Sequence, residues 1–88
     1  MSARPEKHSL TLRGHRTSVS LEQIFWREFR RIAAARDQPL NQLAAEIDVA
    51  RGDIGLASAI RVFVLQEALT RQGSDGGRES QIKANLSA

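Results

Sequence analysis

Polar and apolar side chains alternate along residues 16–21, and this short stretch carries the chain's most specific chemistry. Successive side chains of an extended strand point to opposite faces, so one face carries Arg16, Ser18 and Ser20 and the other Thr17, Val19 and Leu21. A guanidinium and two hydroxyls form a row of hydrogen-bonding groups. Such a row suits either a water-exposed strand face or a surface that binds a polar partner.

The residues that enzymes and metal sites use are scarce. The chain has no Cys, which excludes a disulfide framework, a thiolate zinc site and a cysteine nucleophile. Ser18, Ser20, His15 and Asp48 show neither a glycine-flanked nucleophile nor paired carboxylates at useful spacing. His8 and His15 without Cys nearby are a weak signal for a metal. We therefore expect no enzyme activity, no metal and no cofactor.

Positive charge is concentrated in the first part of the chain. Residues 1–36 hold eight Lys/Arg and three Glu, a net charge of +5, whereas residues 37–72 carry a net charge of −2. A localised basic surface is the electrostatic footprint of nucleic-acid binding. The same arginines could also form an ordinary solvated helix face.

A second alternating stretch lies just upstream. Leu10 and Leu12 share one face of residues 9–13, and Gly14 and His15 separate this stretch from the next. Either the two stretches form a hairpin within one chain, or only the second is a strand and the first is an arm. An isolated two-stranded hairpin is marginal in water, so neither stretch is expected to stand alone.

Three helices are expected after the strand. The first spans about residues 22–36 with Ser20 as its N-cap, and it stops there because Gln38 precedes Pro39 and is pushed out of the helical conformation. The second begins at Pro39 or Leu40 and fades near residue 51. The third, residues 56–71, is apolar nearly all round, so it should be buried. No internal repeat is evident. We expect a disordered arm over residues 1–7, one domain over residues 8–72 and a flexible tail over residues 73–88.

A lone strand in so small a domain needs a partner for its backbone. Two copies related by a twofold axis would pair their strands and intertwine their helices into one core. The expected fold is therefore mainly α with a short β-ribbon, as an intertwined homodimer with an additional C-terminal helix. The dimer core would contain Val19, Leu21, Phe25, Phe29, Ile32, Leu43 and Ile47. The third helix would strengthen this core, join dimers into tetramers or dock another protein.

The segment "RTSVSLEQIFWREFRRIAAARDQPLNQLAAEI" resembles the ribbon-helix-helix DNA-binding proteins of bacteria, phages and plasmids. The likeness covers about residues 16–50 and lies in the order of strand, helix, short break and second helix. The longer stretch from "KHSLTLRG" to "LASAIRVFVLQEAL" also resembles a group of small bacterial members. The upstream "KHSLTLRG" and the third helix are additions to the minimal family pattern.

The resemblance implies a dimer whose two-stranded ribbon lies in the DNA major groove, which admits a β-ribbon. It implies that Arg16, Ser18 and Ser20 face base edges. In this family the start of the second helix anchors a phosphate through backbone N–H groups, which here maps to Leu40 and Asn41. Further phosphate contacts would come from residues beside the ribbon, namely Lys7, Arg13 and His15.

The function we expect is that of a homodimeric, DNA-binding transcriptional repressor reading a pseudo-palindromic operator. Two alternatives remain: an antitoxin that binds DNA and a partner toxin, and a dimeric interaction module that does not bind DNA. The longest apolar run, Val62–Leu65, is far shorter than the roughly 20 residues of a membrane span, and the first ten residues lack a secretory signal. The expected location is cytoplasmic.

Overall fold

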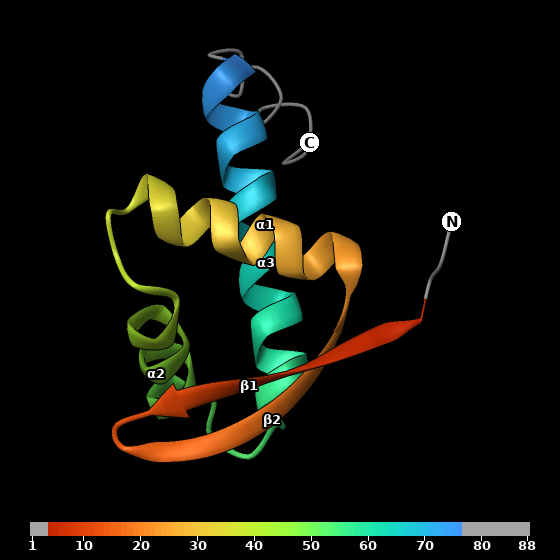
Figure 1. Cartoon of the computed structure of the whole chain (residues 1–88). Helices are drawn as coiled ribbons and strands as arrows, with labels where there is room; N and C mark the ends of the chain where they lie inside the picture. Colours follow the sequence, from red (N-terminus) through yellow and green to blue (C-terminus); the bar gives the residue numbers. More distant parts are fainter. Residues whose placement is uncertain (1–3, 77–88) are drawn as a thin grey trace.

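A computed structural model describes residues 4–76, and its side chains are described over residues 4–72. Two strands come first, followed by three helices (Figure 1). Residues 1–3 of the expected arm and residues 77–88 of the expected tail lie outside the described residues. Residues 5–7 belong to the first strand, and the third helix continues to Gly76.

Strands β1 (Pro5–Leu12) and β2 (His15–Glu22) pair antiparallel along their whole length, from Pro5 opposite Glu22 to Leu12 opposite His15. The two-stranded ribbon expected from the sequence is therefore confirmed. Its composition differs from the expectation, because β2 pairs with the upstream stretch of the same chain and not with β2 of a second copy. Of the two arrangements that the sequence left open, the hairpin is the one adopted.

The hairpin closes through the two residues Arg13 and Gly14, which both have positive φ, 51° and 87°. Two-residue loops with positive φ at both positions are type I′ turns, whose twist matches that of the flanking strands. Glycine adopts this conformation freely, whereas in Arg13 it brings the Cβ atom close to the following carbonyl oxygen and costs free energy. The turn is short, local and compatible with the strand twist, so the chain that leaves β1 returns as β2 directly alongside it.

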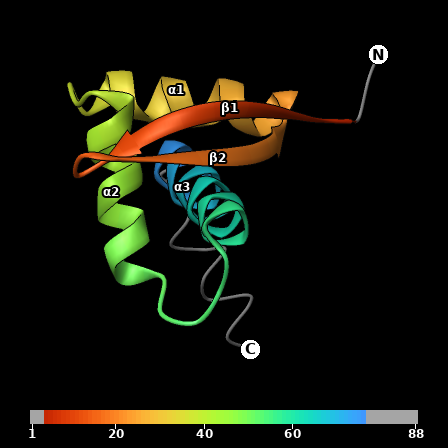
Figure 2. The same ribbon diagram turned by 60° about the horizontal axis from the view of Figure 1, so that its bottom comes forward.

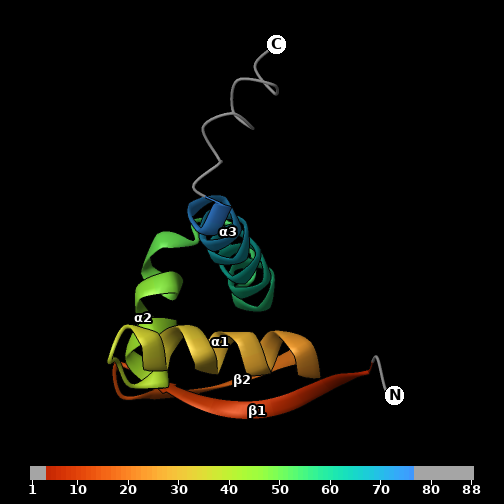
Figure 3. The same ribbon diagram turned by 90° about the horizontal axis from the view of Figure 1, so that it is seen from above.

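The ribbon has one buried face and one exposed face. Its inner face buries four aliphatic side chains: Leu10, Leu12, Val19 and Leu21. All three helices lie on this side of the ribbon (Figure 3). Full burial of a Leu or Val side chain is worth roughly 1.5–3 kcal/mol, which supplies the stability that an isolated hairpin lacks.

Helix α1 (Gln23–Ala35) starts directly after β2. Glu22 occupies its N-cap position and makes no side-chain cap hydrogen bond, so Ser20, expected as the cap, stays in the strand. Trp26 is buried in the core where Phe25 was expected, and Phe25 is only partly buried at the border of the core. The Trp26 indole N–H donates to the backbone carbonyl of Glu6 at 2.8 Å, which gives this ring a polar partner inside the fold.

Helices α2 (Leu40–Ala50) and α3 (Leu56–Gly76) complete the core. Helix α3 packs against α1, α2 and β2, and buries Ala59, Ile60 and Val64 (Figures 1 and 2). It is not buried all round as its composition suggested. Three large apolar residues one to two turns apart stay about half exposed on it: Val62, Leu65 and Leu69. No helix in the described part of the chain is long and apolar enough to cross a membrane.

Two ion pairs hold α3 to the preceding elements. Arg61 donates to the Glu22 carboxylate at 2.9 and 3.2 Å, which joins α3 to the junction of β2 and α1. Its hydrogen bond to Glu22 lowers the pKa of that carboxyl below the ordinary value. Arg36 pairs with Glu67 at 2.9 Å, joining the end of α1 to the second half of α3.

Candidate nucleic-acid interface

The face of the ribbon turned away from the helices is the candidate interface (Figure 3). It carries six polar side chains in two rows: Lys7, Ser9 and Thr11 on β1, and Arg16, Ser18 and Ser20 on β2. Five of the six are exposed and Ser20 is partly buried. We call these six residues the outer face of the ribbon. Their hydroxyl, ammonium and guanidinium groups can all hydrogen-bond to a partner.

The outer face has an uncompensated positive charge. Neither Lys7 nor Arg16 forms an ion pair with another residue in the part of the chain that the structure describes. The Glu22 carboxylate at the end of β2 is engaged by Arg61. The electrostatic character of the surface therefore favours a polyanion.

The structure brings Arg16, Ser18 and Ser20 together on one face of β2, as the alternation predicts. Ser20 differs from the other two because it lies near the end of the strand. Its backbone carbonyl lies 3.5 Å from the Arg61 guanidinium of α3. Ser20 therefore has less freedom to meet a ligand than Ser18.

Ser9 and Thr11 belong to the same surface but were missed in the sequence analysis. The alternation of Ser9, Leu10, Thr11 and Leu12 contains the necessary signal, since it places both hydroxyls opposite the two leucines. The expectation of a strand partner from a second copy assigns no role to these two hydroxyls. Lys7, expected to contact phosphate only, stands in line with these two residues.

Other expected DNA-contacting residues gather at the turn end of the ribbon, beside the start of α2. Arg13 is a turn residue whose guanidinium lies 3.5 Å from the Asp48 carboxylate, and its side chain is 63% exposed. His15 is exposed directly after the turn. Leu40 and Asn41 form the first turn of α2, where backbone N–H groups have no partner within the helix. The Asn41 side chain accepts a hydrogen bond from the Thr11 backbone N–H at 3.2 Å, so it binds β1.

The expected dimer-core residues lie in a core formed by one chain. Six of the seven are buried there: Val19, Leu21, Phe29, Ile32, Leu43 and Ile47. Phe25 is partly buried, with the Arg61 guanidinium 5.8 Å from its ring centre. A single chain buries these side chains without a partner.

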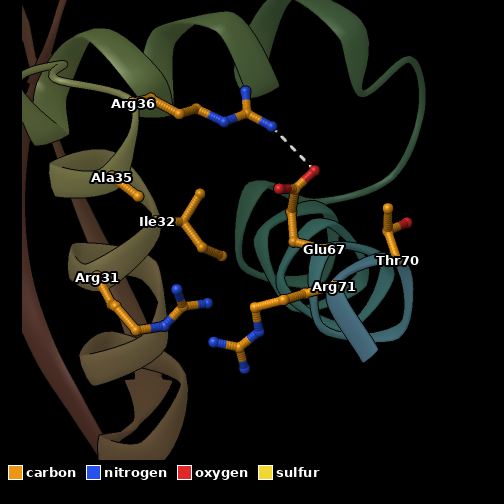
Figure 4. Close-up of a pocket in the computed structure, with 7 residues that line it drawn as sticks. All are labelled: Arg31, Ile32, Ala35, Arg36, Glu67, Thr70 and Arg71. Carbon is orange, nitrogen blue, oxygen red and sulfur yellow. Dashed lines mark ion pairs between the residues drawn. The ribbon is translucent and has the colours of Figure 1, made fainter. Parts of the chain in front are cut away.

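A shallow pocket of about 210 Å³ lies between α1 and α3. Figure 4 shows Arg31 and Arg71 extending toward one another across it, while the Arg36–Glu67 ion pair bounds one side. Arg31 donates to the Glu28 carboxylate at 2.9 Å. This pocket is separate from the outer face of the ribbon, and none of its lining residues belongs to β1 or β2. Over the described residues, no three His, Cys, Asp or Glu side chains group closely enough to hold a metal ion.

Comparison with known protein families gives one match, in which residues 5–68 correspond to the ribbon-helix-helix domain. The match covers both strands, α1, α2 and the first half of α3. This chain belongs to the ribbon-helix-helix family. Ribbon-helix-helix domains are typically non-enzymatic, DNA-binding regulatory modules, and they usually bind DNA as dimers. No curated protein and no solved structure matches the chain.

Proposed function

We propose that this ribbon-helix-helix protein is a transcriptional regulator, acting as a repressor, that inserts its ribbon into the major groove of an operator. The observation that carries the proposal is the outer face, on the side away from the three helices, with four hydroxyls and two cations that have no ion pair among the described residues. The major groove admits a two-stranded ribbon. Arg16 supplies donors suited to guanine, and the serine hydroxyls can donate to or accept from any base edge.

Phosphate contacts at the turn end of the ribbon would fix its position on the duplex. Arg13 and His15 are exposed beside the turn, and the first turn of α2 supplies backbone N–H groups at Leu40 and Asn41. Contacts of this kind set register without reading sequence. In this proposal Arg13, His15 and the α2 start raise affinity for any duplex, whereas the outer face selects the operator.

The proposed regulator is a homodimer, and its dimer interface lies on α3 and not in the ribbon. Val62, Leu65 and Leu69 form an exposed apolar stripe on α3, and the neighbouring Gln66 is uncharged. A twofold interface must be complementary to itself. A stripe centred on Leu65 meets this condition, because antiparallel packing of two α3 helices would set Val62 against Leu69 without facing like charges.

The proposal is tested by retention of genomic duplex fragments, including the region upstream of the protein's own gene, at about 50 and 200 mM salt. Preferential retention of one region, with affinity falling steeply as salt rises, is the expected result. A folded protein that retains no duplex at low salt would contradict it. The ribbon would then be a surface for a protein partner.

Arg16→Ala should weaken binding to the retained operator by about 1–3 kcal/mol and relax base preference where Arg16 contacts the groove. Arg71→Ala is the matched control, because Arg71 is an exposed arginine on the far half of α3 and lines the α1–α3 pocket. Its operator affinity should equal that of the wild type. If Arg16→Ala lowers the affinity for operator and for random duplex equally, Arg16 contacts only phosphate.

A further inference from the structure

The two rows of the outer face have the same chemistry in the same order. Lys7, Ser9 and Thr11 follow one another along β1, and Arg16, Ser18 and Ser20 follow one another along β2. Each row is a cation followed by two hydroxyls. Two strands of unrelated sequence would not be expected to present matching rows.

The pairing register relates the two rows by a local twofold axis. Ser9 lies opposite Ser18, Lys7 opposite Ser20, and Thr11 opposite Arg16. A half-turn about an axis through the Ser9–Ser18 pair, perpendicular to the ribbon, therefore exchanges Lys7 with Arg16 and Thr11 with Ser20. A register shifted by one residue would move one row to the other face of the ribbon and destroy this match. The chemical likeness and the register thus agree position by position.

The likeness continues on the inner face. The same half-turn exchanges Leu10 with Val19 and Leu12 with Leu21, which are all buried. The segments "KHSLTL" and "RTSVSL" are therefore a short internal repeat, contrary to the expectation that the chain contains none. The exception is His8, whose counterpart is Thr17. The His8 and Trp26 rings meet edge-on, with their centroids 4.7 Å apart. Trp26 lies on α1, which follows β2, so Thr17 on β2 has no matching contact to make.

Both ends of β1 are fastened to the helices of its own chain. Near its start, the Glu6 carbonyl accepts the Trp26 indole hydrogen bond, and near its end the Thr11 N–H donates to Asn41. The Arg13–Gly14 turn joins β1 to β2 with the twist that a hairpin requires. Strand β1 therefore completes a two-stranded ribbon with β2 of its own chain, without a strand from a second copy.

We infer that one chain supplies the complete groove-reading surface, with β1 in the place of a second copy's strand. Each ribbon would then read a pseudo-palindromic core by itself, one half through Lys7 and Ser20 and the other through Arg16 and Thr11, with Ser9 and Ser18 at the centre. The inference rests on the proposed function, because it concerns the same outer face. It makes Ser9 and Thr11 specificity-determining residues.

The decisive experiment compares the duplexes that matched single variants select from a randomised library. The variants are Lys7→Ala and Arg16→Ala, which are related by the local axis and lie on the exposed outer face, away from the core. Each should keep the base preference of one half of the core. In the other half, discrimination against the wrong base pair should fall by about 5- to 150-fold. Ser9→Ala and Ser18→Ala should affect positions beside the centre of the core.

Stoichiometry gives an independent readout. With a short one-core duplex in excess, the mass of the wild-type complex should correspond to equal numbers of chains and duplexes, whether or not the chains also associate through α3. Two chains per duplex, together with loss of preference in both halves for each single variant, would overturn the inference and leave the proposed function intact. If a folded wild-type protein selects no sequence, the proposed function fails and the inference fails with it.

Discussion

At the scale of single residues, Arg13 combines two requirements that conflict. Its φ of 51° is a conformation that side chains with a Cβ adopt at a cost of roughly 1–2 kcal/mol, and Asn tolerates it better. Its position at the tip of the ribbon also suits a cation that contacts phosphate. The contact between Arg13 and Asp48 is long and exposed, so it offsets little of the cost.

Arg13→Asn should therefore raise the free energy of unfolding by about 1 kcal/mol, since Asn-Gly is the preferred pair for a type I′ turn. The same substitution should lower affinity for operator and random duplex alike, because only a phosphate contact is removed. Urea unfolding and duplex titration measure the two effects. Gly14→Ala is the control, and its strained φ of 87° should make it less stable than the wild type. A loss of stability in Arg13→Asn would contradict the turn assignment.

At the scale of elements, α3 is held to the ribbon by its contact with the junction of β2 and α1. Arg61 donates to both oxygens of the Glu22 carboxylate, and its guanidinium also lies 5.8 Å from the Phe25 ring centre. The hydrogen bond from Arg61 lowers the pKa of Glu22 in the folded chain. A carboxyl with a lowered folded-state pKa stabilises the fold fully above its unfolded-state pKa, and the contribution disappears as pH falls through the folded-state value.

The free energy of unfolding of the wild type should accordingly decrease on acidification from about pH 5 downward, since an unfolded Glu titrates at about pH 4.3. Glu22→Gln and Arg61→Gln should each reduce the difference in unfolding free energy between neutral and acidic pH. The double variant should reduce it no further, because both substitutions remove one interaction. Urea unfolding of the four proteins at several pH values provides the test. Additive effects of the two substitutions would mean that the carboxylate and guanidinium act independently.

At the scale of the whole molecule, a single chain forms a closed core and still exposes one apolar stripe. Leu65 is 56% exposed at the middle of that stripe, between Val62 and Leu69. The core of this chain forms without the stripe, whereas the proposed dimer would bury the stripe in its interface. Pairing through α3 would leave both ribbons free to enter DNA, because the outer faces lie on the opposite side of the helices (Figure 3).

Leu65→Glu should convert the dimer into a monomer, because two carboxylates would then meet near the twofold axis without compensation. Sedimentation equilibrium should report a mass of two chains for the wild type and one for the variant. Val49→Glu is the matched control, since Val49 is 66% exposed on α2 and does not belong to the α3 stripe, and the dimer should persist. If the wild type remains a single chain at all concentrations, α3 is not a dimer interface.

The sequence by itself determined the elements and the faces that they present. Local rules of alternation, helical periodicity and turn chemistry predicted β2, the three helices and the shared face of Arg16, Ser18 and Ser20. They also contained the match between "KHSLTL" and "RTSVSL", which becomes evident once the register is known. These features depend on neighbouring residues, so they can be read from the chain.

Only the tertiary structure decided where the partner of β2 comes from. A strand with unpaired backbone groups accepts a partner from its own chain or from another, and alternation is the same in both cases. The choice depends on contacts between distant residues, namely the Trp26 N–H with the Glu6 carbonyl and the Thr11 N–H with Asn41. Periodicity also could not set which side of α1 would be buried, because Phe25 and Trp26 are adjacent. The ring that reaches β1 is the buried one, and the sequence left open whether residues 9–13 form a strand.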